Sequence, residues 1–516
     1  MTTPVSDSQT GFIAFVERVG RRIPDPVIIF IYFLVGALLL TALMGGITFE
    51  THGAGGVPVV HEIQNMLARE NVVWLFDNAL LANWLGFGGG VLGVILIVML
   101  GVGIAEHSGL FGAVLKKISR SLPVTWLPLL LVFLGIMSSI ATDAGYLILI
   151  PLAGLLYAGL GKNPLIGMAA AFAGVSAGFS ANLIPATPID VIIGVNAQVF
   201  AEAQGIPFVN AAGDALTPAT MHYYFILVST FVLAAVGAWV TVKFVGPRLE
   251  HKPYTVPEEL QISDFDVTLA EQRGLRASGI ALVLALAAVA ALALGPLAPY
   301  TNEAGQQVTP FLNNIILVIT FVFAAIGIAF GVASGKFSSM MDVVKAMVKQ
   351  MDTMGYILVL TFFCYNFLGV LSYSGLGAYI TYLGANALIL MGLQSYPVLL
   401  LIGFVLVTAL INLFVGGLTS KWMLLGPIFI PMLYMVNPAM TPDLVAAAFR
   451  VADSATNIIT PMMTYAGIIL AFMRKYNPEL RFGDMIAMML PYSLAFLGVW
   501  ILLLVAFFSF GIPLGF

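Results

Sequence analysis

Polar and acidic side chains stand inside one of the most apolar stretches of this chain. Residues 180–190 read SANLIPATPID, so that Asn182 and Asp190 lie close to Pro185 and Pro188. Two prolines within one helix open it, because proline donates no backbone hydrogen bond and clashes with the preceding turn. Freed backbone groups and half-helix ends carry partial charges that hold an ion or an anionic group. The stretch therefore predicts a binding site.

A similar motif, SATNIITP, recurs at 454–461. Asn182 follows Thr142 in the stretch IMSSIATDAG by 40 positions, and Asn457 follows Thr419 in the stretch INLFVGGLTSKW by 38. This matched order and spacing predict one module used twice in opposite orientations, with repeat regions 85–196 and 354–473. Such inverted repeats are typical of secondary transporters, whose site lies near the membrane midplane between the repeats.

Three carboxylates fall at predicted membrane depth: Asp143, Asp190 and Asp453. An ionised group there costs about 2.5–3.5 kcal/mol on insertion scales and usually handles ions or protons. Arg450 precedes Asp453 by three residues, so that the two share a helix face and are expected to pair. Asp190 has no cation close in sequence, and a carboxyl in that setting exchanges a proton near neutral pH. Asp143 is expected to cap a short helix.

The second polar stretch ends in GGLTSKW, which offers the hydroxyls of Thr419 and Ser420, the ammonium of Lys421 and the indole of Trp422. Tryptophan usually lies at the membrane interface, and an indole at midspan can stack on an aromatic substrate or simply fill the core. Lys421 is able to attract an anion or to extend toward the outer surface. Amide contacts to a substrate are expected from three asparagines: Asn182, Asn412 and Asn457.

The elements that position these residues are membrane helices. Hydrophobic residues make up 60% of the 516 and charged residues 9%, and the mean hydropathy is +1.01. These values exclude a water-soluble domain. The single cysteine, Cys364, excludes an intrachain disulfide, and no Cys and His spacing indicates a metal site. Nothing basic and aromatic indicates nucleic acid. The five histidines lie in loops or near span ends, so no Ser and His pair for catalysis is expected at depth.

Nine apolar runs are long enough to cross the bilayer. They begin near residues 26, 85, 163, 222, 277, 311, 354, 442 and 485. Two further runs, 123–159 and 397–435, are broken by polar residues and are interpreted as re-entrant hairpins, since freed backbone at this depth must face protein or water. The positive-inside rule places the N-terminus and the loop 247–276 in the cytoplasm. The first run is expected to stay in the bilayer rather than to be cleaved as a signal.

Three segments resemble the aminobenzoyl-glutamate transporter (AbgT) family over nearly the whole chain: ERVGRRIPDPVIIF near the N-terminus, GGLTSKW, and FRVADSATNIITPMMTY. The resemblance implies a homodimer in the bacterial inner membrane. Each subunit would have nine transmembrane helices, two opposed re-entrant hairpins and a water-filled, inward-facing bowl. It also implies uptake of p-aminobenzoyl-glutamate and, for some members, proton-driven export of sulfonamide antimetabolites.

Family positions carry over to Asp190, Trp422, Pro442, Arg450, Asp453 and Pro461, with Thr419 where some relatives have serine. The resulting hypothesis is an all-α transporter without cofactor that works by alternating access on a small aromatic anion, surrounded by lipid. Arg450 would bind a substrate carboxylate, and Asp190 and Asp453 would couple protons. Sodium coupling through hydroxyls, amides and opened carbonyls stays an alternative, and an ion channel is a further one. The direction of transport is not encoded in single residues.

Overall fold

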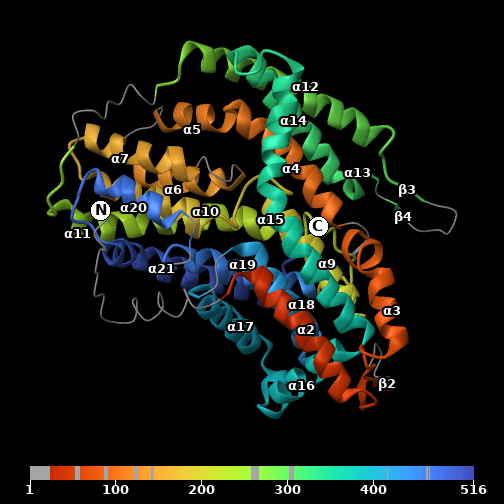
Figure 1. Cartoon of the computed structure of the whole chain (residues 1–516). Helices are drawn as coiled ribbons and strands as arrows, with labels where there is room; N and C mark the ends of the chain where they lie inside the picture. Colours follow the sequence, from red (N-terminus) through yellow and green to blue (C-terminus); the bar gives the residue numbers. More distant parts are fainter. Residues whose placement is uncertain are drawn as a thin grey trace, which may run out of the picture.

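The computed structural model describes most of the chain and leaves several short gaps. Described are residues 24–52, 58–86, 91–120, 126–140, 145–256, 266–301, 307–308, 310–414, 417–460, 463 and 465–516. The described chain is mostly helical (Figure 1). Its two small sheets are antiparallel pairs, β1 (Thr48–His52) with β2 (Pro58–Glu62) and β3 (Tyr300–Thr301) with β4 (Gln307–Val308).

Seven described helices are long and apolar enough to cross a membrane. They contain Val27–Met44, Tyr223–Glu250, Leu269–Leu294, Ile315–Ser334, Met354–Tyr373, Leu418–Val436 and Phe482–Ser509. Many of their leucines and valines point outward, and Leu294 and Leu43 are 86% and 83% exposed. Apolar surface on this scale is stable against lipid rather than water. The prediction of a polytopic membrane protein agrees with this finding.

The chain up to residue 334 contains long helices and several short ones. Its elements are α2 (Pro26–Met44), α3 (Arg69–Asn78), η1 (Leu81–Leu85), α4 (Val91–Ser108), α5 (Leu110–Arg120), α6 (Leu127–Met137), η4 (Ser138–Ile140), η5 (Gly145–Leu149), α7 (Ile150–Gly159), α8 (Pro164–Phe172), η6 (Ala173–Ala177) and α9 (Pro188–Glu202). The next elements are α10 (Tyr223–Val240), η7 (Thr241–Val245), α11 (Gly246–Glu250), α12 (Leu269–Leu294), α13 (Pro310–Asn313) and α14 (Ile315–Ser334).

The second half repeats this order. Its elements are α15 (Met340–Tyr373), α16 (Leu376–Leu390), η9 (Leu393–Ser395), α17 (Pro397–Asn412), α18 (Leu418–Val436), α19 (Pro442–Asn457), α20 (Ala466–Arg474) and α21 (Phe482–Ser509). In each half a long helix is followed by a shorter one, a helix pair and an interrupted helix. The first set is α4, α5, α6 with α7, and α8 with α9; the second is α15, α16, α17 with α18, and α19 with α20. The short helices α5 and α16 were not separated by the sequence analysis.

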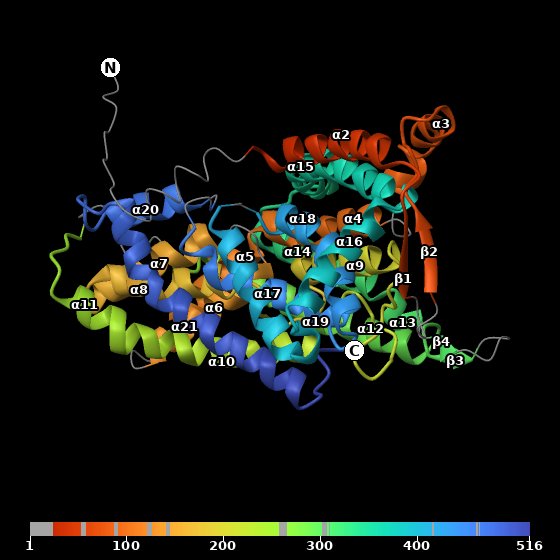
Figure 2. The same ribbon diagram turned by 90° about the horizontal axis from the view of Figure 1, so that it is seen from below.

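The helices form an outer scaffold and an inner group. In the scaffold α12 packs on α14, α14 on α4, α4 on α15 and α15 on α2 (Figure 1). Figure 2 shows α2, α3 and the β1–β2 hairpin at one end of the molecule and α8, α10 and α11 at the other. In the inner group α19 contacts α9, α17, α18 and α21, and each of its residues from Pro442 to Thr456 is buried. α19, which carries Arg450 and Asp453, therefore lies in the interior of the protein.

Close approach of backbones holds the first helix pair against the first interruption. Gly135 on α6 faces η6, and a Cβ atom added to it would lie 2.7 Å from the backbone N of Val175. Only glycine fits this crossing, and small residues at such crossings are a common device of membrane helices. The contact places the end of α6 beside the polar segment that follows η6.

Candidate functional site

The first predicted break is present. Helical structure ends with η6 at Ala177 and resumes with α9 at Pro188, so that Pro185 lies in irregular backbone. Ala186 has φ of +54°, the only positive φ of a non-glycine residue in the described parts of the chain. A left-handed alanine costs of the order of 1 kcal/mol and persists only where its surroundings impose it. The break is therefore held by tertiary packing as well as by the prolines.

Asn182 anchors this break to the first helix pair. Its side-chain oxygen accepts a hydrogen bond from the backbone N of Ile184 at 2.9 Å, and its Nδ2 donates to Ser139 Oγ at 3.0 Å. Tyr223 OH donates to the backbone oxygen of Leu183 at 3.0 Å. The neighbouring residue Asp143 lies outside the described residues, and so its predicted capping role cannot be compared with the structure.

Asp190 begins the helix that follows the break. Its Oδ2 accepts hydrogen bonds from the backbone N and the hydroxyl of Thr187 at 2.9 and 2.8 Å, while Thr187 Oγ1 caps the backbone N of Asp190. Its other oxygen, Oδ1, lies 2.6 Å from Arg450 Nη2. The sequence showed no cation near Asp190, because the partner comes from the other half of the chain.

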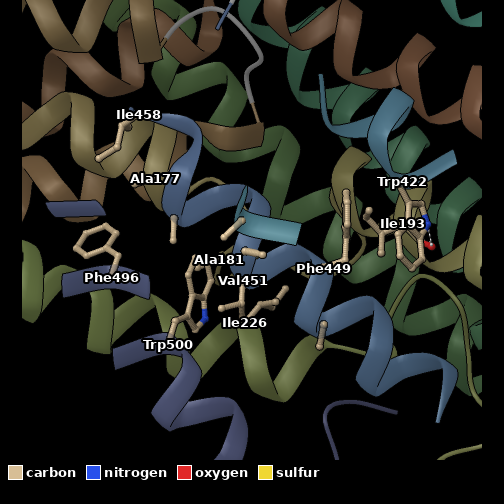
Figure 3. Close-up of a cluster of buried hydrophobic side chains, with 14 of the residues drawn as sticks. Ala177, Ala181, Ile193, Ile226, Trp422, Phe449, Val451, Ile458, Phe496 and Trp500 are labelled. Carbon is tan, nitrogen blue, oxygen red and sulfur yellow. Dashed lines mark hydrogen bonds between the residues drawn. The ribbon is translucent and has the colours of Figure 1, made fainter. Parts of the chain in front are cut away.

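The second predicted break is also present. α19 ends at Asn457 and α20 begins at Ala466, and the described residues between them, 458–460, 463 and 465, are not helical. Pro461 itself lies outside the described residues. Asn457 Nδ2 donates to Ser176 Oγ at 3.2 Å, so that the two interrupted helices meet. Figure 3 draws Ala177 and Ile458, the residues at the ends of η6 and α19, among the buried hydrophobic side chains of the core.

Arg450 is the centre of this junction and is 2% exposed. Besides the ion pair with Asp190, its Nη2 donates to the backbone oxygen of Ser180 at 2.8 Å. Its Nη1 lies 3.1 Å from His222 Nδ1, and His222 Nε2 lies 2.8 Å from the backbone oxygen of Asp443. Since arginine only donates, Nδ1 accepts and Nε2 carries the proton of a neutral imidazole. No local pattern in the sequence indicated His222.

The predicted pairing of Arg450 with Asp453 is wrong. Arg450 pairs with Asp190 of α9, and Asp453 Oδ1 is in ion-pair contact with Lys421 Nζ of α18. α19 packs against both α9 and α18, and so each of its two charged side chains reaches a partner on a different neighbour. A shared helix face is a weak constraint, of a few tenths of a kcal/mol, and tertiary ion pairs outweigh it.

Lys421 is buried, 2% exposed, and does not extend to the outer surface. Its Nζ also donates to Asn412 Oδ1. Asn412 Nδ2 in turn donates to the backbone oxygen of Asp453 at 2.6 Å and to Thr456 Oγ1 at 2.7 Å. Asn412 thus fixes the end of α17 to α19 and orients the lysine toward the carboxylate.

Trp422 lies in the core in this conformation. Its indole is fully buried, and its Nε1 donates to the backbone oxygen of Ile193 at 3.0 Å (Figure 3). Its ring packs on Phe449 and Phe200 at centroid distances of 4.8 and 5.9 Å. Stacking on a substrate stays a prediction that needs the indole to be uncovered. The other predicted positions lie near it in the chain: Ser420 is buried, Thr419 is half-buried on α18, and Pro442 opens α19.

Four buried polar atoms at or beside Arg450 make no hydrogen bond among the described residues: Arg450 Nε, Asp190 Oδ1, Ser180 Oγ and Ser454 Oγ. The two serines open the matching motifs SANLIP and SATNIITP. Buried polar groups are normally paired, and exceptions in a polar cluster indicate capacity for a ligand. Within the described residues no group of three or more His, Cys, Asp or Glu side chains is arranged to hold a metal.

Apolar spans, two interrupted helices and a buried charged junction between them define a polytopic membrane protein of the transporter class. The chain belongs to the AbgT putative transporter family, whose model matches residues 11–516. This agrees with the resemblance seen in the sequence.

A curated relative, the p-aminobenzoyl-glutamate transport protein of Escherichia coli K12, is 29% identical over 520 residues, which cover 100% of this chain and 98% of the relative. Two solved structures share the fold. The YdaH transporter of Alcanivorax borkumensis, described as having an unusual topology, is 36% identical with a TM-score of 0.85, covering 95% of this chain and 100% of its own. Neisseria gonorrhoeae MtrF, described as illuminating a class of antimetabolite efflux pumps, is 33% identical with a TM-score of 0.83, covering 96% and 97%.

Proposed function

We propose that this protein is a proton-coupled secondary transporter of the bacterial inner membrane that moves p-aminobenzoyl-glutamate or related aromatic anions by alternating access. The observation that carries the proposal is the junction at Arg450, where a cation from one interrupted helix meets a carboxylate and a freed backbone oxygen of the other. A cation between two half-helix ends is a suitable receptor for an anionic group.

The residues at the junction have different roles in substrate binding in this proposal. Arg450 binds a substrate carboxylate, and its unpartnered Nε together with an Nη supports a two-pronged contact. Amides of Asn182, Asn412 and Asn457 contact the substrate once the helices separate, and Trp422 supplies an aromatic face when the core around it opens. Pro185 and Pro461 open the backbone at the two breaks, Pro442 begins α19, and Thr419 and Ser420 supply hydroxyls.

Proton coupling follows from charge balance. When a substrate carboxylate takes Arg450, Asp190 loses its partner inside a dry environment. An unpaired buried carboxylate is expensive, and protonation removes the cost. Asp453 depends in the same way on Lys421 as its buried cationic partner. Asp190 and Asp453 are therefore the proton carriers of the proposal.

Nine crossings with two opposed re-entrant hairpins, a cytoplasmic N-terminus and a homodimer complete the proposed architecture. The repeated order of elements in the two halves supports an inverted repeat. The crowding of lysine and arginine into the predicted cytoplasmic loops, including 247–276, supports the orientation.

Export of antimetabolites is the second candidate, favoured by the likeness to MtrF, whose description names antimetabolite efflux. Sodium remains the alternative coupling ion. Hydroxyl and amide oxygens of the junction are suitable ligands for a hard cation, although the described residues contain no cluster of three or more acidic, His or Cys side chains.

The test is transport by purified protein in proteoliposomes. Labelled p-aminobenzoyl-glutamate and a sulfonamide are offered in both directions, with a pH gradient or with a sodium gradient at fixed pH. Asp190→Asn keeps the shape of the helix cap and is expected to abolish stimulation by the pH gradient. The matched control is Asp77→Asn, which changes an exposed carboxylate on α3. Undiminished stimulation in Asp190→Asn refutes the coupling role, and wild-type flux equal to protein-free vesicles refutes the transport proposal.

A further inference from the structure

Two ion pairs of opposite polarity meet on α19. Arg450 and Asp453 belong to this helix, and their partners Asp190 and Lys421 come from α9 and α18. All four side chains are between 1% and 4% exposed. The junction therefore holds two cations, and a protein carboxylate masks each of them in this conformation.

A gain in folding stability does not account for these two buried ion pairs. Replacing a buried ion pair by apolar residues of similar volume is often neutral or stabilising, because the pair must be removed from water. The pair at Arg450 is also poorly aligned: Asp190 Oδ1 makes no hydrogen bond in spite of its short distance to Nη2, and Nε is unpartnered. A purely structural arginine would use its planar fork on the carboxylate.

We infer that Lys421 is a second substrate anchor beside Arg450, so that the transporter selects anions with two carboxylates. The inference rests on the proposed function and adds to it the class of substrate and the number of protons that travel with each substrate molecule. In this structure Asp190 and Asp453 pair with the two cations, and in the loaded state the two substrate carboxylates replace them. Asn412, which holds Lys421 and binds α19, keeps the ammonium at the junction after Asp453 is displaced.

Charge balance then fixes the number of protons. A dianion added to two cations and two ionised aspartates would leave two uncompensated negative charges in a dry site, whose cost protonation of both aspartates removes. The buried acidic and basic side chains of α9, α18 and α19 are Asp190, Lys421, Asp443, Arg450 and Asp453, and His222 at the start of α10 adds a buried imidazole. His222 faces Arg450 as a neutral acceptor. One dianion therefore travels with two protons, and the transport step carries no net charge.

The inference is tested in proteoliposomes with two probes that share an aromatic amine. Both carboxyls of p-aminobenzoyl-glutamate are ionised at neutral pH, whereas p-aminobenzoyl-glutamine carries only one. Uptake is driven by an inward pH gradient, and a potassium gradient with valinomycin sets the membrane potential. The wild type is expected to take up the dianion at a rate that does not change between zero and inside-negative potential.

The variant Lys421→Gln/Asp453→Asn removes the second pair without leaving a buried unpaired charge. Its KM for the dianion is expected to rise about tenfold or more, the effect of losing one charge-assisted contact, while its KM for the monoanion is unchanged. In this double variant only Asp190 is left to carry a proton, so each dianion travels with one proton and the transport step moves one net negative charge. An inside-negative membrane potential of about 100 mV is then expected to lower accumulation of the dianion about 50-fold.

Lys421→Arg is expected to keep the dianion preference. The matched control Lys345→Gln removes an exposed lysine whose side chain is 72% exposed.

An unchanged KM ratio in the double variant, or wild-type dianion flux that responds to potential, overturns the inference while the transport proposal stands. The wild-type measurement needs no variant, so a double variant that fails to fold leaves the inference testable. Absence of flux for both probes in the wild type overturns both proposals.

Discussion

Removing the guanidinium of Arg450 is expected to destabilise the protein more than removing its partner. Arg450→Gln breaks the ion pair with Asp190 and the contacts to Ser180 and His222. Asp190 then keeps only the two hydrogen bonds from Thr187 at 4% exposure. Leaving one partner of a buried pair uncompensated costs about 3–5 kcal/mol.

Asp190→Asn also leaves one buried charge without its partner, the guanidinium, but it is expected to cost less, because the helix cap and the contacts of Arg450 to Ser180 and His222 are retained. The double variant Arg450→Gln/Asp190→Asn contains no unpaired charge. Its destabilisation is expected to be smaller than the sum of the two single effects by about 2–3 kcal/mol, the coupling typical of residues in direct contact.

The assay is thermal unfolding of the detergent-solubilised protein followed by tryptophan fluorescence. All variants are scanned at one rate, because unfolding of a membrane protein is often irreversible. The expected order of midpoint temperatures is wild type, Asp190→Asn, the double variant close to it, and Arg450→Gln lowest. Strictly additive shifts, or an Arg450→Gln midpoint equal to that of the surface control Asp77→Asn, would refute the reasoning.

Two further predictions concern packing. Gly135→Ala forces a Cβ against the backbone of Val175 and is expected to lower the free energy of unfolding by about 1–3 kcal/mol. At Gly93 nothing lies within 4 Å of an added Cβ, so Gly93→Ala is expected to be neutral or slightly stabilising. The midpoint temperatures of the two variants in the same thermal assay check this prediction. Trp422→Phe loses the hydrogen bond to Ile193 and is expected to cost about 1 kcal/mol, and Trp422→Ala about 3–5 kcal/mol, measured in the same way. Equal midpoints for the two Trp422 variants would contradict burial of the indole.

Much of the site could be anticipated because its signals are local. Pro185 and Pro188 break a helix through their own covalent structure, and the break is found between Ala177 and Pro188. Matched motifs at 180–185 and 454–461 indicated two such breaks that meet. The short helices α5 and α16 escaped notice, since 11 and 15 residues are too few to give a distinct span signal.

The charge pairing was not accessible in this way. Arg450 and Asp453 are neighbours on one helix, and local reasoning paired them, but each bonds to another element. His222 joins Arg450 from a position that the sequence marked only as a span end. Lys421 was equally compatible with an outer surface or an interior position, because its long side chain reaches both.

The sequence by itself determined that this is a polytopic membrane protein with two interrupted helices, because hydropathy and proline act within a few residues along the chain. Family membership also followed from motifs spread over its length. Only the tertiary structure decided which charge meets which. α9, α18 and α19 pack against one another, and this packing, rather than spacing along the chain, brings Asp190 to Arg450 and Lys421 to Asp453. Ion pairs in a dry interior depend on distances of a few ångströms between elements far apart in sequence, and no local pattern encodes those distances.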